Sequence, residues 1–492
     1  MKTAYALLTA FIAIVLPAGA QMRVMAEPNH SPLVTFRIVF TVGAAADTPS
    51  KPGLAYLTAA MIANSGSKSL TYQQIEDAMF PLAADFSSQV DKEMTTFYGT
   101  THVDHLDEYY KLIHGMLLDP GWREDDFKRV KDDCIHSIQS GLRNNDEELA
   151  KEVLYSDIYQ GMPYAHYNGG TVSGLESITL DDVRGFYGSR YTQGVLILGL
   201  SGGFTPAFLE KVKADMRKLP PSIGMHTRHP EPGLIHGNRA IIVEKDTRAT
   251  AISFGFPISC TRQNPDWPAL LVASSYLGQH RMAGGVLYDE MREKRGLNYG
   301  DYSYIEYFPQ GMYRMAAEQN LARRYQIFQI WIRPVHPENA KFALRLALYE
   351  LDQLIKNGIS EENFQMSRDF VSKYSALQLR TQSAQLGFAV DSLFYDSPAF
   401  IDALRAKLSK LTAAEVTRVA RRYLRTKDLS IAIVANHAED LRQQLASDDP
   451  SPMEYNTPKS QAILDVDKVV QKWPLDLKAD SIQIVPAAQI FQ

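Results

Sequence analysis

The pattern of hydrophobic and polar positions divides the chain into two halves that show the same order of elements. The first half alternates or clusters apolar residues as expected of strands at 34–42, 86–90, 93–103 and 195–200 and helices at 54–64, 72–80, 104–118, 124–140 and 147–159. The second half predicts strands at 251–256, 302–308, 312–317 and 429–434 and helices at 267–277, 337–356 and 361–379.

Landmark residues recur at a nearly constant spacing between the halves. Thr179 and Thr412, each an N-cap before a short helix, lie 233 residues apart, and Phe127 and Phe364, each after an acidic helix start, lie 237 apart. A period this long indicates a duplicated domain and not a solenoid. The pattern predicts an α+β fold of two homologous domains, each a largely antiparallel sheet packed with helices. Together they form a clamshell around a groove.

The breaks between periodic segments give the domain limits. We predict an N-terminal domain at 29–220, a linker rich in Pro, Gly and His at 221–237, a C-terminal domain at 238–440 and a surface-wrapping tail at 441–492. Residues 1–20 combine a lysine, a short apolar run and a small-x-small end, which is typical of a secretory signal peptide. We therefore expect an exported protein, periplasmic or secreted and soluble, with no membrane span in its mature form.

Composition narrows the range of partners. The net charge of −5 over 492 residues gives no basic surface for a polyanion, so nucleic acid is not an expected partner. The two cysteines, Cys134 and Cys260, have no metal-type spacing. We expect two separate buried thiols, while a disulfide between them stays open at this point.

The segment 284–304 predicts a helix, a glycine stop and a strand, around which a candidate site is arranged. Arg292 lies near the end of the helix, and Tyr299 lies in the predicted strand beyond Gly296. If the turn at Gly296 brings them together, a guanidinium and a phenol form a donor pair for a carbonyl oxygen or an oxyanion. The alternative is that Arg292 caps helical carbonyls and Tyr299 packs in the sheet.

Three stretches resemble the insulinase/pitrilysin family of zinc metallopeptidases. These are Gly43…Asp47…Gly53-Leu-Ala-Tyr-Leu-Thr-Ala-Ala60, then Pro163-Tyr164…Tyr191, and Met291-Arg-Glu-Lys-Arg-Gly-Leu-Asn-Tyr299. The resemblance extends from about residue 34 to the tail and implies the clamshell fold.

The chain departs from the family at the metal site. Active members carry His-x-x-Glu-His, whose histidines bind zinc and whose glutamate polarises the zinc-bound water. The matching ligand positions here are Tyr56 and Ala60, the base position is Ala59, and the third ligand position is Ser137. The resemblance therefore implies that this chain holds no zinc.

Other histidines and carboxylates do not rebuild such a site in the sequence. His102 and His105 are too few for a structural zinc, and His136 has no partner on the first helix, so we expect ordinary surface histidines. The pairs Asp132-Asp133 and Glu147-Glu148 indicate a solvated helix face.

Within the family, an Arg and a Tyr at this spacing bind the substrate carbonyl across from zinc, and some members divide the two roles between polypeptides. The resemblance implies that this chain is the zinc-less subunit of a heteromeric metallopeptidase, inactive alone. Its homologous partner would carry the zinc motif, and Arg292 and Tyr299 would act on an unfolded peptide. A peptide-binding or scaffolding protein of the same fold is the main alternative. A peptidase that uses another mechanism is a third.

Overall fold

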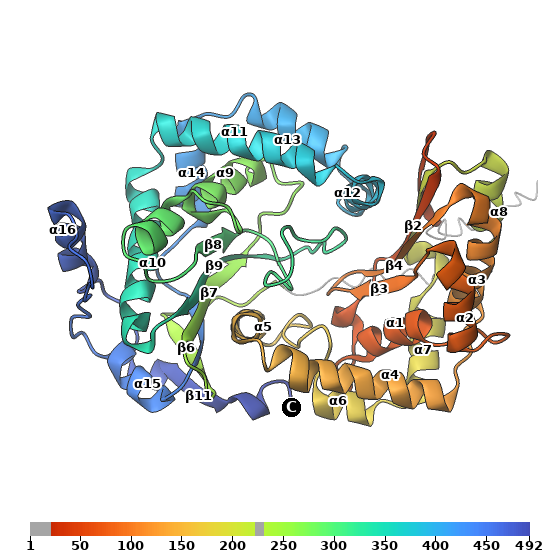
Figure 1. Cartoon of the computed structure of the whole chain (residues 1–492), viewed down its shortest axis with the longest axis horizontal. Coiled ribbons are helices and arrows are strands. Elements are labelled where there is room, and N and C mark those ends of the chain that lie inside the picture. Colours follow the sequence, from red (N-terminus) through yellow and green to blue (C-terminus); the bar gives the residue numbers. More distant parts are fainter. Residues whose placement is uncertain (1–20, 222–230) are drawn as a thin grey trace, which may run out of the picture.

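The computed structural model describes residues 21–221 and 231–492. The predicted signal peptide, 1–20, and most of the predicted linker lie outside the described residues. Figure 1 shows two lobes side by side, one from each half of the chain. Among the described residues, no helix combines the length and the apolar character needed to cross a bilayer.

The N-terminal lobe is built on a five-stranded sheet of order β1-β5-β2-β4-β3. Strands β1 and β5 pair in parallel and the other neighbours are antiparallel. Its elements are β1 (Arg23–Pro28), β2 (Leu33–Phe40), α1 (Leu54–Asn64), α2 (Tyr72–Met79), β3 (Ser87–Val90), β4 (Thr95–His102), α3 (Leu106–Leu118), α4 (Glu124–His136), α5 (Asp146–Ile158), α6 (Val172–Ser177), α7 (Leu180–Arg190), β5 (Leu196–Gly202) and α8 (Pro206–Met216).

The C-terminal lobe is built on a six-stranded sheet of order β11-β6-β10-β7-β9-β8, in which β6 pairs in parallel with β10 and β11. Its elements are β6 (Arg239–Glu244), β7 (Thr250–Ile258), α9 (Trp267–Gly278), β8 (Asp301–Tyr304), β9 (Gln326–Val335), α10 (Ala340–Asn357), α11 (Glu361–Gln378), α12 (Gln382–Phe394), α13 (Phe400–Leu408), α14 (Ala413–Tyr423), β10 (Ser430–Ala435), α15 (Ala438–Ala446), α16 (Gln461–Val470) and β11 (Ile482–Pro486).

The two sheets have the same topology, strand for strand, once β11 is set aside. Strands β1 to β5 correspond in order and pairing to β6 to β10. The helices correspond as well, because α1 packs on α4 and α7 just as α9 packs on α11 and α14. Capping boxes at Thr179 and Thr412 begin α7 and α14, as their spacing predicts. The α+β architecture with two duplicated lobes is confirmed, with each sheet mixed.

Each lobe covers the inner face of the other lobe's sheet with one helix. Helix α5, from the first half, packs on β7 and β10 of the C-terminal sheet. Helix α12, from the second half, packs on β5, β2 and β1 of the N-terminal sheet. Both helices lie between the lobes in Figure 1, while α2, α3 and α8 on one side and α10 and α14 on the other lie away from the junction.

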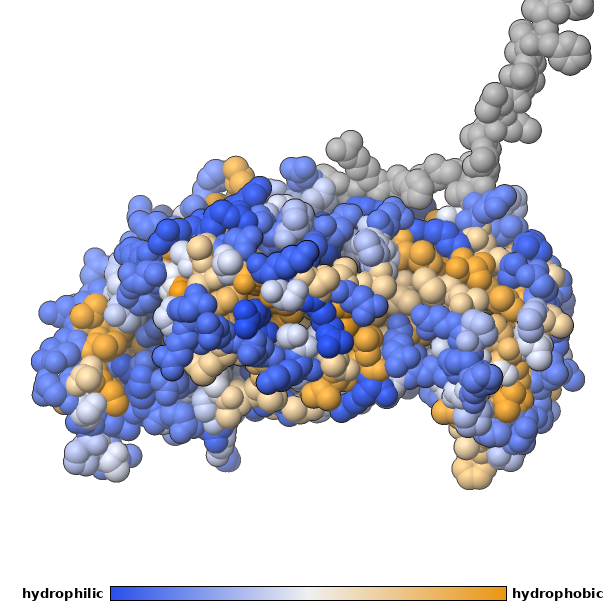
Figure 2. Space-filling view, turned by 90° about the horizontal axis from the view of Figure 1, so that it is seen from above, coloured by the Kyte–Doolittle hydropathy of each residue, from blue (hydrophilic) through white to orange (hydrophobic). Residues whose placement is uncertain are grey.

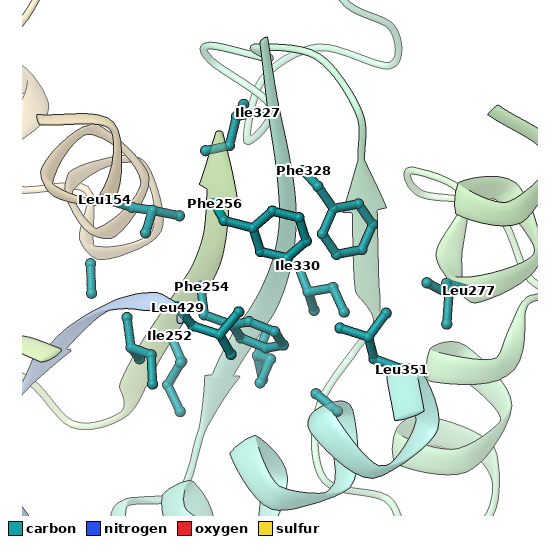
Figure 3. Packing of buried hydrophobic residues seen from close by; sticks show 14 of the residues in the cluster. Leu154, Ile252, Phe254, Phe256, Leu277, Ile327, Phe328, Ile330, Leu351 and Leu429 are labelled. Atoms are coloured by element: carbon teal, nitrogen blue, oxygen red, sulfur yellow. The ribbon is translucent and has the colours of Figure 1, made fainter. Parts of the chain in front are cut away.

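Apolar packing accounts for this exchange. Leu149, Val153, Leu154 and Ile158 of α5 belong to the hydrophobic core of the C-terminal lobe. Figure 3 shows Leu154 approaching the sheet on one side, while Phe254 and Phe256 of β7 point toward the helices on the other. Because buried apolar surface stabilises by about 25 cal/mol per Å², this packing fixes α5 to the C-terminal lobe.

Several predicted elements differ from the structure. The predicted pairing of 302–308 with 312–317 is wrong, because β8 pairs instead with β9 and residues 312–317 form no strand. The tail also differs from the predicted surface wrap: it contributes α15, α16 and β11, the last an edge strand of the C-terminal sheet. Its end returns to the N-terminal lobe, where the Arg143 Nε donates to the Ile490 carbonyl at 2.9 Å.

Candidate functional site

A cavity of about 690 Å³ lies between the lobes, in agreement with the predicted groove. Tyr56, Gln89 and Ser137 line it from the N-terminal lobe, and Tyr307 and Arg314 line it from the C-terminal lobe. Helix α5 contributes Glu148 and Glu152 to its wall. The lining is rich in hydroxyl, amide and charged groups, so the cavity suits a hydrated polar ligand such as a peptide backbone.

Two of the positions matched to the zinc motif line this cavity. Tyr56 reaches it from α1, and Ser137 reaches it from the π-helical turn that extends α4. Ala59 is buried in α1, and Ala60 is partly buried beside it. Burial and the neighbouring Cys134 raise the pKa of Tyr56 to about 12, which keeps the phenol neutral. A neutral phenol, two methyl groups and a hydroxyl do not make a tetrahedral zinc site.

The described parts of the chain contain no group of three or more His, Cys, Asp or Glu side chains arranged to hold a metal. His102 and His105 stand with their ring centroids 6.4 Å apart, and the His102 Nδ1 accepts from the Asp104 N–H at 3.2 Å. His136 is exposed on α4. Cys134 and Cys260 are both free and buried, which confirms two separate thiols.

The prediction of a solvated face at Glu147 and Glu148 is wrong, because both side chains are buried at the lobe junction. Glu148 accepts from the backbone N–H groups of Gln310 and Met312 at 2.9 and 3.1 Å. It also pairs with Lys151 on the next turn of α5, 3.2 Å away. Asp132 and Asp133, by contrast, are exposed as predicted.

Buried charges join the two lobes around the cavity. Arg323 forms a bidentate ion pair with Asp91, and its Nε lies 2.7 Å from the Asp91 Oδ2. Arg324, whose side chain is half-exposed, pairs with the buried Glu93 through one guanidinium nitrogen, and its backbone N–H donates to the same carboxylate at 2.8 Å. Glu152 accepts from the Tyr307 hydroxyl at 2.9 Å, and burial raises the pKa of its carboxyl. Burial, with the positive charge of Arg323, lowers the pKa of Lys92.

Sequence reasoning missed these buried charges, although one signal was available. Helix α5 carries charged residues on the same turns as the leucines that enter the core of the other lobe. A helix surrounded on all sides has no solvated face on which to place them, so their charges must be paired.

Arg292 and Tyr299 lie on either side of a Schellman-type helix end at Gly296. Gly296 has a φ of +67°, its N–H donates to the Arg292 carbonyl at 2.9 Å, and the Leu297 N–H donates to the Met291 carbonyl at 2.9 Å. The helical segment before it is a π-helical turn, Tyr288–Glu293. The glycine stop predicted from the sequence is therefore present.

Both side chains of this pair are accessible. Tyr299 is 77% exposed and precedes β8, so its predicted place inside the strand is wrong. The Arg292 Nη1 donates to the Tyr288 hydroxyl at 2.7 Å, and its guanidinium lies 4.9 Å from the centre of that ring. Neither residue lines the cavity between the lobes.

Comparison with known proteins places this architecture in a family. The sequence matches the model of the insulinase family, peptidase family M16, over residues 23–170. It matches the model of the peptidase M16 inactive domain over residues 177–370. The chain belongs to the insulinase family. The first match lies within the N-terminal lobe, and the second runs from the last helices and strand of that lobe through the middle of the C-terminal lobe.

Relatives within the insulinase family are distant, and two of the following three cover most of the chain. A Helicobacter pylori protein named non-peptidase homolog YmxG is 21% identical over 428 residues, covering 86% of this chain and 93% of that protein. The beta subunit of the Caenorhabditis elegans mitochondrial-processing peptidase is 22% identical over 192 residues, covering 39% of this chain and 41% of that subunit. An uncharacterized zinc protease of Streptomyces coelicolor is 22% identical over 449 residues, covering 85% of this chain and 88% of that protein.

Solved structures show the same fold. The crystal structure of a peptidase M16 inactive domain from Pseudomonas fluorescens aligns with a TM-score of 0.74 at 22% identity, covering 85% of this chain and 96% of that chain. A Helicobacter pylori protease aligns with a TM-score of 0.73 at 15% identity, covering 85% and 97%.

Proposed function

We propose that this insulinase-family chain is the zinc-less subunit of an exported heteromeric metallopeptidase that degrades or processes peptides. The observation that carries the proposal is a contrast between two sites. Tyr56 and Ser137, two of the positions matched to the zinc motif, reach the cavity without offering metal ligands, while Arg292 and Tyr299 remain accessible at an ordered helix end. The name of one relative, a processing-peptidase subunit, supports a role within an assembly.

In this proposal a homologous partner supplies the His-x-x-Glu-His motif, and its zinc activates the attacking water. The task of this chain is to bind the peptide and to donate hydrogen bonds to its carbonyl oxygen. Because Arg292 and Tyr299 do not line the cavity of the single chain, they would face a chamber that the partner completes. A guanidinium and a phenol placed there stabilise the negative charge that develops on the oxygen.

The test is to co-express this chain with homologues that carry the zinc motif and to measure peptide hydrolysis and the metal content of each subunit. We expect Arg292→Ala and Tyr299→Phe each to lower kcat on the order of 10²–10³-fold. Co-purification of the two subunits should not change. Arg217→Ala, at an exposed arginine after α8, is the matched control. Full turnover by both variants would reject the role of the pair.

A second candidate function is peptide binding or scaffolding without proteolysis. Strand β3 is the edge strand of the N-terminal sheet, and Ser88 and Gln89 of this strand line the cavity. An extended peptide can add to such an edge through main-chain hydrogen bonds. The relative named a non-peptidase homolog supports this candidate. This second function is favoured if peptides bind the isolated chain while none of the zinc-motif homologues yields an active complex.

A further inference from the structure

The C-terminal lobe contains a second, smaller cavity of about 140 Å³, distinct from the one between the lobes. Its wall is formed by α9, α11 and the segment from β8 to Ala317, with Phe388, Phe400 and Leu404 closing it from α12 and α13. Tyr307 lines both cavities, so the two lie on opposite sides of the segment that follows β8.

This cavity lies between the helices of the C-terminal lobe that correspond to those carrying the zinc-motif positions in the N-terminal lobe. Helices α9 and α11 correspond to α1 and α4, which carry the zinc-motif positions. The spacing of 237 residues that relates Phe127 to Phe364 relates Ser137 to Tyr374, and Tyr374 lines the cavity. The duplication has therefore left a pocket at this place in the second lobe.

The chemistry of the pocket is that of an apolar side-chain site. Its charged groups are already neutralised, because Arg262 donates to Glu306 and Asp391 at 2.9 and 3.0 Å. His280 accepts from the Tyr304 hydroxyl at 2.6 Å and donates to the Arg314 carbonyl at 2.9 Å, and burial lowers its pKa to about 4. The rest of the lining is largely aromatic and aliphatic.

The surface beside the pocket points to a ligand. Trp267 contributes a buried indole ring, 4% exposed, to the lining. Met315, 55% exposed, stands in the lining, and Leu377 of α11 is 60% exposed on the helix that forms the wall. Exposed Met and Leu beside an apolar pocket are typical of surfaces that bind polypeptides. Figure 2 shows hydrophobic patches among hydrophilic residues on one face of the molecule.

We infer that this pocket binds a large apolar side chain, of the size of phenylalanine, from an extended peptide. The volume supports this size, because an apolar cavity of about 150 Å³ takes up benzene. The inference rests on the proposed function only in taking a peptide as the ligand. It adds that substrates are selected for an apolar residue on the zinc-less chain.

The experiment uses the isolated chain, without partner or metal. The probe is a Gly/Ser peptide that contains a single 4-fluorophenylalanine, followed by fluorine NMR. Unlabelled peptides with Phe or Ala at that position compete with it. Since burying a Phe side chain stabilises a complex by about 1.5–3 kcal/mol, we expect the Phe peptide to compete on the order of ten to a hundred times better.

Two matched variants test whether the peptide binds in this pocket. Ala316 is exposed and lines the pocket, so Ala316→Trp should fill the entrance and abolish the preference for Phe. Ala376→Trp makes the same change at an exposed position of α11 outside the lining and should retain it. Equal competition by both peptides, or an unchanged preference in Ala316→Trp, would overturn the inference. A mixed complex that fails to hydrolyse peptides rejects the proposed function and leaves this result standing.

Discussion

Replacement of Asp91 by Asn tests whether a buried ion pair fixes the two lobes to each other. Asp91 lies in the β3–β4 turn of the first lobe, and Arg323 lies just before β9 of the second. The two side chains are 0% and 1% exposed. The Arg323 guanidinium also lies 3.7 Å from the centre of the Tyr307 ring, so the pair stands at the wall of the central cavity.

The expected change in the free energy of unfolding follows from the loss of one buried charge. Removing one member of a buried pair typically destabilises a protein by about 3–5 kcal/mol, because the other charge stays desolvated. Asn keeps one oxygen that can accept from Arg323, so we expect about 3 kcal/mol, at the lower end of that range. The double variant Asp91→Asn/Arg323→Met leaves no unpaired charge and should recover most of the loss.

Urea unfolding followed by circular dichroism measures these differences. The control is Asp132→Asn, an exposed aspartate of α4, which should change the free energy of unfolding by no more than about 0.5 kcal/mol. If Asp91→Asn behaves like this control, or if the double variant is less stable than the single one, the pair does not hold the lobes as argued.

Three further predictions concern Asp301, Gly53 and the zinc-motif positions. Burial raises the pKa of Asp301 to about 8, so its carboxyl stays protonated in the folded state while the unfolded state ionises at about pH 4. The free energy of unfolding therefore falls by about 1.4 kcal/mol for each pH unit as the pH rises between these two values. Asp301→Asn should remove this fall, which urea unfolding at pH 5 and pH 9 measures. Gly53→Ala should lower stability by about 1–3 kcal/mol in thermal unfolding, because Gly53 has a φ of +100° and a Cβ would lie 2.9 Å from the Gly169 carbonyl oxygen. The fourfold change Tyr56→His, Ala59→Glu, Ala60→His and Ser137→Glu should give stoichiometric zinc by elemental analysis where the natural chain takes up none, and failure to bind zinc would refute the placement of these positions around one site.

The exchanged helices α5 and α12 bear on how the molecule could move. Opening the central cavity would have to break the ion pairs of Asp91 with Arg323 and of Glu93 with Arg324. Helix α5 is held to the C-terminal lobe by its apolar packing on β7 and β10 and by the hydrogen bond from Tyr307 to Glu152, so α5 should move with the C-terminal lobe.

The sequence by itself determined those features that depend on near neighbours. Helices and strands with clear periodicity, the capping boxes at Thr179 and Thr412 and the glycine stop at Gly296 all form where the local pattern predicts them. The duplication and the absence of zinc ligands at Tyr56, Ala59, Ala60 and Ser137 were also readable from spacing and side-chain chemistry.

Only the tertiary structure decided the features that depend on distant segments. Glu147 and Glu148 look like a solvated pair, but the other lobe buries them, since the partners of Glu148 at Gln310 and Met312 are more than 160 residues away. The 312–317 segment has strand-like composition yet leaves β8 to pair with β9, because pairing register is fixed by burial in the whole sheet. Burial and charge pairing depend on which distant segments the fold brings together, and the local sequence pattern does not specify those segments.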